Sequence, residues 1–534
     1  MSSIRIAIAL FLAAALLYLA TLTAFYSPDG MSFTMLIGAG DVGNPLWFQA
    51  EHLLYPAVGA TWAAGWGLVG VRPHVSLQVL NALAGAATVA FSFLGLAALR
   101  PGYRRAVVLG AVGLAVSYGH WLHATDVEDQ MLSNMLVALA FWLLAEFLRR
   151  RWGLLAAGVG LAQAGAALIH LTAALWTLPA LVALLWTRRW RALGAYLATL
   201  AVATGLPYLL VGVVRFGYVT PGDYWGWFLS APGHGVWGRF SPANLWTAGR
   251  ALVEAFIYQQ GGLRLGELLR GQFDTANLLA VAGFAMIVLV LLALGGYTVL
   301  TLVRPRETDE RRSVTLFTLW VAIFTLFNIY WAPEDVQFWT VVLLPLWGLA
   351  SLLVARSQVA GYRSQESSQP RAILHSASCD LRPVTCLLLT ALFVVNLGTA
   401  FWPHRDPQNN AGLQTALCVG QHTTPADLIV APGWDWASSY LPYFAGRRVL
   451  SLVDTVLLGA GGDPELGLQL TDAAIAQTWA AGGRVYVVRL FSLSDTDRTW
   501  LHETAGLSPA DFTARPRQPA FVCRDETVWE WIRP

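Results

Sequence analysis

The sequence predicts an α-helical polytopic membrane protein that ends in a small C-terminal α/β domain. Three observations lead to this prediction: the composition, a series of about eleven apolar stretches of spanning length, and a change of pattern after Trp402. Of the 534 residues, 56% are hydrophobic and only 12% are charged. A soluble protein of this length needs more charge to cover its surface, so the bilayer is expected to be its main solvent.

The apolar stretches are long enough to form transmembrane helices, which need about 20 residues each. The first stretch exceeds the length of a signal-peptide core and has no small-x-small cleavage site, so we expect it to be a retained helix. The stretches lie at roughly 4–25, 76–99, 106–123, 130–148, 152–170, 171–187, 192–214, 276–303, 314–331, 336–354 and 383–402.

A further apolar stretch, 53–71, either crosses the membrane or lies along its surface. If it crosses, the arginine cluster at 100–105 falls outside and every later loop inverts. If it does not cross, all the arginine clusters fall inside, as the positive-inside rule requires; they lie at 100–105, 149–151, 188–191, 304–312 and 356–382. We therefore expect 53–71 to be an interfacial or re-entrant helix on the outer surface.

This topology predicts a cytoplasmic N-terminus and an extracytoplasmic C-terminus, in what we expect to be a bacterial inner or plasma membrane. Residues 1–402 are expected to form the transmembrane domain and residues 403–534 the extracytoplasmic domain. The outer segments of the first domain are predicted at 26–75, 124–129, 215–275 and 332–335.

The C-terminal domain is predicted from three short β-branched runs, 426–432, 447–454 and 484–490, with helical patterns between them at 436–445 and 466–481. This alternation is typical of a βαβαβ core. The segment Gly433 to Trp436 follows the first strand, where α/β folds tend to bind ligands, although a loop with packed tryptophans is the plainer interpretation. Cys418 and Cys523 are the two cysteines of this domain, and a disulfide between them is a possibility that the sequence leaves open.

Ionisable residues near the bilayer are costly, and here they gather on the predicted outer side. Each has a structural alternative, as a turn, a helix terminus or a hydrogen-bonded interface residue. The tract His120–Asp129 holds three carboxylates and two histidines between apolar helices, more than a turn needs. Its carboxylates would also suit Mg²⁺ or Mn²⁺, although no cofactor is firmly expected. The candidate site residues on this side are Asp29, Glu51, His52, Asp126, Glu128, His170, Glu334 and Asp335.

These features in this order resemble the GT-C superfamily of membrane glycosyltransferases, in particular its bacterial protein-O-mannosyltransferase-like branch. An acidic residue follows the first helix in "SPDG", and "EHLLYPAVGATWAAGWGLVG" is similar to the family's juxtamembrane helix with His, Pro and Tyr. "HATDVEDQ" corresponds to an acidic second outer loop, and "ALIHLTAALWTLPALVALL" to a short helix pair joined by His and Thr. The likeness extends over most of residues 1–350.

The resemblance implies inverting transfer of a sugar from a polyprenyl-phosphate-linked donor, outside the cytoplasm, to a glycan, lipid or protein acceptor. Asp29 would be the general base that deprotonates the acceptor hydroxyl. In eukaryotic protein mannosyltransferases a paired Asp-Glu stands in the first loop, whereas Gly30 follows Asp29 here, so Glu51 or Glu128 would supply any second carboxylate. The departing lipid phosphate would be bound by His52, His170 and an arginine of 215–275, for which Arg239 is the candidate.

Two other classes of protein share parts of this pattern. A transporter or flippase usually has paired repeats with helices broken at the membrane midplane, and neither feature is evident here. A lipid-handling protein that kept the fold without catalysis is the other alternative. Nothing in the sequence suggests a nucleic-acid partner, and it contains no phosphate-binding glycine loop, GxSxG or HExxH motif.

Overall fold

The structure is a computed structural model that describes residues 2–229, 238, 240–259, 275–303, 308–366 and 380–533. Contacts divide the chain into two compact units. The first contains the residues up to Leu22, those from Asp41 to Leu229, and the described residues up to Pro403. The second contains Thr23–Gly40 and His404 to the C-terminus, so that a segment close to the N-terminus is grouped with the C-terminal sheet.

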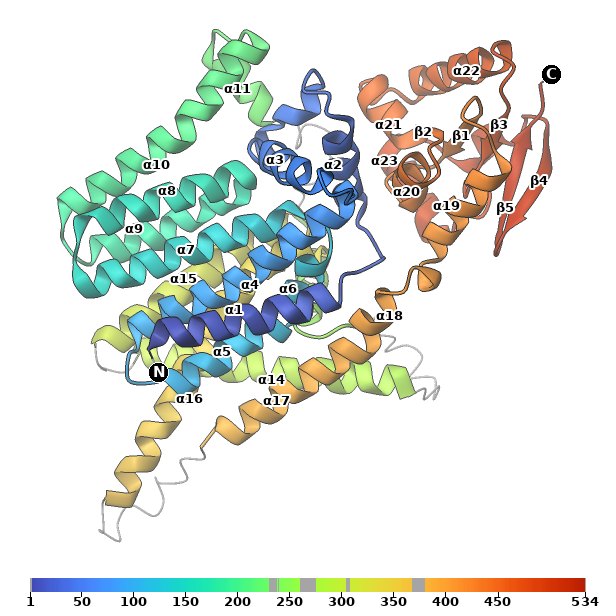
Figure 1. The fold of residues 1–534 in the computed structure, drawn as a ribbon. Coiled ribbons are helices and arrows are strands. Elements are labelled where there is room, and N and C mark those ends of the chain that lie inside the picture. The colour runs from blue at the N-terminus through green and yellow to red at the C-terminus, as the bar shows by residue number, and fades with distance from the viewer. Residues whose placement is uncertain are drawn as a thin grey trace. The chain divides into compact units, whose positions relative to one another are not determined.

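The first unit is a bundle of helices. α4 packs against α1 and α7, α7 packs against α8, and α8 packs against α10 (Figure 1). Its longer helices are α1 (Ser3–Ala20), α4 (Pro73–Leu99), α7 (Asp129–Arg150), α10 (Trp190–Val211), α14 (Thr275–Val303), α15 (Thr308–Trp331), α16 (Val336–Glu366) and α17 (Arg382–Asn396). Its shorter helices are α3 (Tyr55–Gly67), α5 (Arg104–Val116), α6 (Tyr118–Thr125), α8 (Gly153–Ile169), α9 (Thr177–Leu185), α11 (Pro221–Phe228) and α12 (Pro242–Glu254).

The helices confirm an integral membrane protein. Among the described residues, 8 helices are long and apolar enough to cross a bilayer, and the bent pair α5–α6 makes 9 if it counts as one span. The apolar helices α8 and α9 are shorter. Every predicted apolar stretch coincides with one of these helices, while the count of eleven spans stays a prediction. α1 ends at Ala20, earlier than the predicted residue 25, and α3 has only 13 residues, too few to span a bilayer.

The bend between α5 and α6 is 57° and lies at Ser117. Backbone groups released from a helix inside a membrane must find other partners. Here the N–H groups of Tyr118 and Gly119 donate to the carbonyls of Phe256 and Ala255, over 3.1 and 2.8 Å. The Ser117 hydroxyl accepts from the Trp347 indole over 2.9 Å. These hydrogen bonds stabilise the bend. It is followed by α6 and then by the acidic loop that precedes α7.

The second unit is built on a five-stranded sheet with the order β2-β1-β3-β5-β4. β1 (Leu428–Ala431) pairs in parallel with β2 (Arg448–Ser451) and β3 (Val485–Val487). These strands, with α20 (Trp436–Phe444) and α22 (Pro464–Ala480), confirm the predicted βαβαβ core. The sequence interpretation missed the antiparallel hairpin of β4 (Arg517–Cys523) and β5 (Glu526–Trp531), which extends the sheet beyond β3.

Helices cover both faces of this sheet. Because side chains alternate along a strand, Leu428 and Val430 of β1 point into one apolar cluster and Ile429 and Ala431 into the other. The first cluster includes residues of α22 and α23 (Asp495–Ala505). The second includes residues of α19 (Ala411–His422), α20 and α2 (Pro28–Ala39). Cys418 of α19 and Cys523 of β4 form a disulfide on this second side, as the sequence allowed.

Candidate functional site

The first unit brings together two histidines and an aspartate that are far apart in the sequence. His52 ends the short helix η2 (Ala50–His52), and its Nδ1 contacts Oδ2 of Asp129, the first residue of α7. The Asp129 side chain is 1% exposed and that of His52 is 22% exposed. A buried carboxylate is stabilised by an adjacent cation, so this contact favours the charged imidazolium form of His52.

His170 completes this cluster, which we call the histidine cluster (His52, Asp129 and His170). Its ring lies 5.1 Å from the ring of His52, in an edge-on arrangement. The Thr172 hydroxyl lies 2.7 Å from Nδ1 of His170 and holds the ring in place at the junction of α8 and η3 (Leu171–Trp176). His52 and His170 were both predicted site residues, and the structure places them side by side.

The segment that carries His52 is held by residues from three other elements. Tyr208 of α10 donates its hydroxyl to the Ala50 carbonyl over 2.6 Å, and Trp227 of α11 donates its indole N–H to the Phe48 carbonyl over 3.0 Å. The N–H of Leu54 donates to the Leu168 carbonyl, just before His170. Trp227 belongs to the predicted outer segment 215–275, so part of that segment serves to position the histidine cluster.

The acidic loop before α7 is clamped by polar side chains of α4. Gln78 donates to the Thr125 carbonyl over 2.9 Å. Asn81 donates to the carbonyls of Asp126 and Glu128, over 2.9 and 2.6 Å. The Asp126 carboxylate accepts from the N–H of Val127 over 2.7 Å, which gives it a role in shaping the turn. Asp126 and Glu128 are both buried.

Tyr55 and Glu51 lie beside the histidine cluster. Burial raises the pKa of the Tyr55 hydroxyl, and the negative charges of Asp129, Glu128 and Asp126 raise it further. One carboxylate oxygen of Glu51 is buried and has no hydrogen-bond partner among the residues that the structure describes. Tyr55 was missed as a site residue, although its position at the start of an interfacial helix next to "EH" could have indicated it.

Two further predicted site residues, Glu334 and Asp335, lie in the turn that precedes α16. Asp335 accepts from the N–H of Gln337 over 2.9 Å and so caps α16, and Glu334 is exposed, which fits the alternative of a structural turn. Phe338 in the first turn of α16 still contacts the ring of His170. Arg239 lies outside the described residues.

Asp29 belongs to the second unit. It lies in the first turn of α2, where Ser27 caps the helix by accepting from the N–H of Gly30 over 2.9 Å. The Asp29 side chain is exposed. A carboxylate at this place is favoured by the partial positive charge of the helix N-terminus. Its catalytic role stays a prediction.

The histidine cluster could also hold a metal ion. One ligand atom from each of its three residues lies within 4.8 Å of the others. Two imidazoles and one carboxylate suit Zn²⁺, Fe²⁺ or Mn²⁺ better than Mg²⁺, which prefers oxygen ligands. This set shares only Asp129 with the three carboxylates of the tract His120–Asp129 that were predicted to suit a metal ion. A second group, Cys418, His422 and Cys523, has its two sulfurs joined in the disulfide.

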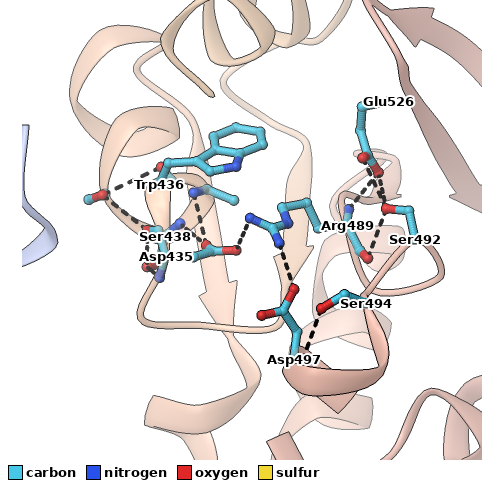
Figure 2. Close-up of polar contacts among 10 residues, drawn as sticks. Asp435, Trp436, Ser438, Arg489, Ser492, Ser494, Asp497 and Glu526 are labelled. Carbon is cyan, nitrogen blue, oxygen red and sulfur yellow. Dashed lines mark hydrogen bonds and ion pairs between the residues drawn. The ribbon is translucent and has the colours of Figure 1, made fainter. Parts of the chain in front are cut away.

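In the second unit, the predicted segment Gly433 to Trp436 is engaged in structural contacts. Asp435 caps α20 by accepting from the N–H groups of Ala437 and Ser438, over 2.9 and 3.3 Å (Figure 2). Arg489, which follows β3, pairs with Asp435 over 3.4 Å and with Asp497 over 3.3 Å (Figure 2). The Trp434 indole donates to Asp454 over 2.6 Å. The segment therefore fits the plainer interpretation of a packed loop.

Replacing Arg489 by glutamine is expected to lower the stability of this unit by about 2 kcal/mol at neutral pH, because Asp435 would keep its charge without the cation. Burial raises the pKa of Asp435, and Arg489 opposes part of that rise. In the variant the folded form holds the proton of Asp435 more tightly than the unfolded chain does. The penalty is full above the folded-state pKa, shrinks as the pH falls below it, and is gone below the pKa of the unfolded chain.

Thermal unfolding of the wild type and the variant at neutral and acid pH measures this effect. The gap between the two midpoints should be wide at neutral pH and narrow in acid. Arg484→Gln is the control, because Arg484 is exposed and its 3.9 Å pair with Glu530 contributes little. An equal difference between the two midpoints at neutral and acid pH would contradict the role of Arg489 as the cation that stabilises the charged Asp435.

Comparison with solved structures gives matches along nearly the whole chain. ArnT from Cupriavidus metallidurans, solved with undecaprenyl phosphate, matches with a TM-score of 0.56 and 16% identity over 98% of this chain and 97% of ArnT. The apo Archaeoglobus fulgidus oligosaccharyltransferase matches with a TM-score of 0.55 and 11% identity over 90% of this chain and 69% of its own. No protein-family model and no curated relative matches the sequence. The chain therefore has the fold of the GT-C membrane glycosyltransferases, while the protein-O-mannosyltransferase-like branch stays a prediction.

Proposed function

We propose that this protein is an inverting glycosyltransferase that takes its sugar from a polyprenyl-phosphate-linked donor on the extracytoplasmic side of the membrane. The observation that carries the proposal is the histidine cluster, which brings two imidazoles and a buried carboxylate together in a membrane-embedded bundle of GT-C fold. The matched ArnT structure contains undecaprenyl phosphate, and one of the oligosaccharyltransferase structures contains a dolichol phosphate.

In the proposed reaction an acceptor hydroxyl attacks the anomeric carbon while the bond from that carbon to the phosphate oxygen breaks. Asp29 takes the proton of the hydroxyl, and the polyprenyl phosphate leaves with the bonding electron pair. The role of Asp29 rests on the sequence resemblance. The developing positive charge on the sugar ring favours nearby carboxylates, for which Glu51 and Glu128 are the candidates.

The histidine cluster would bind the leaving phosphate. His52, charged through its contact with Asp129, would neutralise the added negative charge on the phosphate oxygens, and an N–H of His170 would donate to them. Such charge-assisted bonds strengthen as the bond to the sugar breaks, so they lower the barrier as well as hold the substrate. Asp129, which contacts His52, would act as its counter-ion.

An apolar groove along α3 would take the polyprenyl chain. It has a volume of about 650 Å³, begins at Leu54, close to His52 in the sequence, and follows one face of α3 to Trp62 and Trp66. The lining residues recur at helical spacing, which leaves a continuous apolar stripe. A lipid whose phosphate binds the histidine cluster would have its first isoprene units along this stripe.

Filling the groove is expected to weaken donor binding. Gly65 lines the groove, and a side chain added there meets no atom within 4 Å, so Gly65→Leu should fill it without disturbing the fold. We expect KM for the polyprenyl donor to rise about tenfold, which corresponds to the loss of one buried apolar contact. Gly67 lies on the same helix in equally open space but does not line the groove, so Gly67→Leu should leave KM unchanged. Equal values of KM for the two variants would exclude the groove as the lipid site.

The proposed function itself is tested by turnover of purified protein with a polyprenyl-phosphate-linked sugar. Release of polyprenyl phosphate is the product to measure, because it is common to every acceptor class. We expect release to require an acceptor and the product to have inverted anomeric configuration. Movement of the intact donor across liposomes without release would instead support a flippase and contradict the proposal.

A further inference from the structure

The second unit holds the segment that carries Asp29 together with the C-terminal sheet. The segment Thr23–Gly40 belongs to the same compact unit as the sheet. Its helix α2 packs against α20, and Met31 of α2 is fully buried in the apolar cluster formed by α19, α20 and the sheet. Asp29 is therefore attached to the sheet domain by residues on both sides of it.

Tyr440 of α20 forms the main polar anchor on the N-terminal side. Its hydroxyl donates to the carbonyl of Tyr26 over 2.7 Å and accepts from the N–H of the same residue over 2.9 Å. One side chain thus satisfies both backbone groups of Tyr26, a residue that no helix or strand includes. The ring of Tyr26 also lies against Tyr440 and Phe444, with centroids 6.0 and 5.5 Å away.

Asn410 adds a second anchor. Its side-chain amide donates to the Ala24 carbonyl over 2.7 Å and to the Tyr440 hydroxyl over 3.3 Å. Its side-chain oxygen accepts from the N–H of Leu413 and caps α19. The N–H of Ala24 donates to the His404 carbonyl over 2.7 Å. The backbone from Ala24 to Tyr26 is thereby fixed by three residues of the C-terminal part of the chain.

We propose that the C-terminal domain is the platform that positions the general base, and that Tyr440 and Asn410 are its positioning residues. The proposal rests on the proposed function, in which Asp29 accepts the proton of the acceptor hydroxyl. Fixing Tyr26 on one side and Met31 on the other determines where α2 begins, and therefore where the Asp29 carboxylate lies. Neither anchor touches the substrate, so their effect on the reaction is exerted through Asp29.

The test is the variant Tyr440→Phe, which keeps the ring packing and removes the hydroxyl. We expect kcat to fall about tenfold or more, because small displacements of a catalytic group have large effects on rate, while KM for the polyprenyl-phosphate sugar stays unchanged. Amide hydrogen exchange should become faster in residues 24–34 and stay slow in the sheet. Asn410→Asp, which keeps the cap of α19 and loses the amide donor, should show the same pattern.

Tyr486→Phe is the matched control. Tyr486 is buried in the same apolar cluster, but its hydroxyl interacts with Arg484 and not with the segment of Asp29. Equal losses of kcat in Tyr440→Phe and Tyr486→Phe would overturn the proposal, as would full kcat in Tyr440→Phe with faster exchange in residues 24–34. These outcomes differ from failure of the proposed base, which would appear as full activity in Asp29→Asn whatever the result with Tyr440.

Discussion

Replacement of Asp29 by asparagine is expected to lower kcat for sugar transfer by about 10³-fold, within the range that a positioned general base contributes. Asparagine has the same shape but cannot accept the proton of the acceptor hydroxyl. The side chain is exposed in the first turn of α2, and Ser27 supplies the cap of that helix, so the variant should fold like the wild type. Steady-state release of polyprenyl phosphate in the presence of acceptor measures the effect.

Asp495→Asn is the control for this substitution. Asp495 lies in the first turn of α23, in the same unit, and its side chain is 99% exposed, so the loss of charge and of a first-turn carboxylate is matched. We expect that variant to keep the wild-type rate. Unchanged kcat in Asp29→Asn, with an unfolding midpoint equal to that of the wild type, would remove Asp29 as the base.

Replacement of His52 by alanine is expected to lower kcat/KM for the polyprenyl-phosphate donor by about 10²-fold. The loss corresponds to about 2.7 kcal/mol, a typical value for a charged donor to a phosphate oxygen in a partly buried site. The buried Asp129 would lose its counter-ion at the same time, so a lower unfolding midpoint is expected as well. Initial rates over a range of donor concentrations give the first effect, and thermal unfolding gives the second.

The variant His52→Arg distinguishes between two roles for His52, as a positively charged donor to the phosphate and as a ligand of a metal ion. An arginine restores a positive charge beside Asp129 and can donate to a phosphate, so we expect it to recover part of kcat/KM. It cannot ligate a metal. If the histidine cluster works by holding Zn²⁺ or Mn²⁺, His52→Arg should be as inactive as His52→Ala, and a chelator should inactivate the wild type.

Much of the fold could be predicted because each element has its own local signal. The run 428–431 is short, β-branched and flanked by turn residues, and it forms β1, which lies between β2 and β3 in the sheet. The arginine clusters identified 53–71 as a non-spanning segment, and the structure has only the short helix α3 there. The hairpin of β4 and β5 was missed because its strands carry several polar residues and Pro519, which weaken the alternating pattern.

The candidate site was predicted only in part. The sequence indicated His52 and His170 because an ionisable residue beside apolar helices is energetically costly and is therefore a candidate for a functional role. It did not single out Asp129 among three adjacent carboxylates, since only the packing of α7 against η2 and η3 decides which of them meets the histidines. The attachment of the backbone at Ala24 and Tyr26 to Asn410 and Tyr440 depends on contacts across most of the chain length, and no local pattern encodes such contacts.

The central claim is that the histidine cluster binds the phosphate of the lipid carrier, and a structure of the full chain with undecaprenyl phosphate in a lipid nanodisc tests it most directly. The account predicts phosphate density within hydrogen-bond distance of His52 and His170, with Asp129 behind His52 and the first isoprene units along α3. Phosphate bound elsewhere, with His52 and Asp129 still in contact and no lipid beside them, would contradict it.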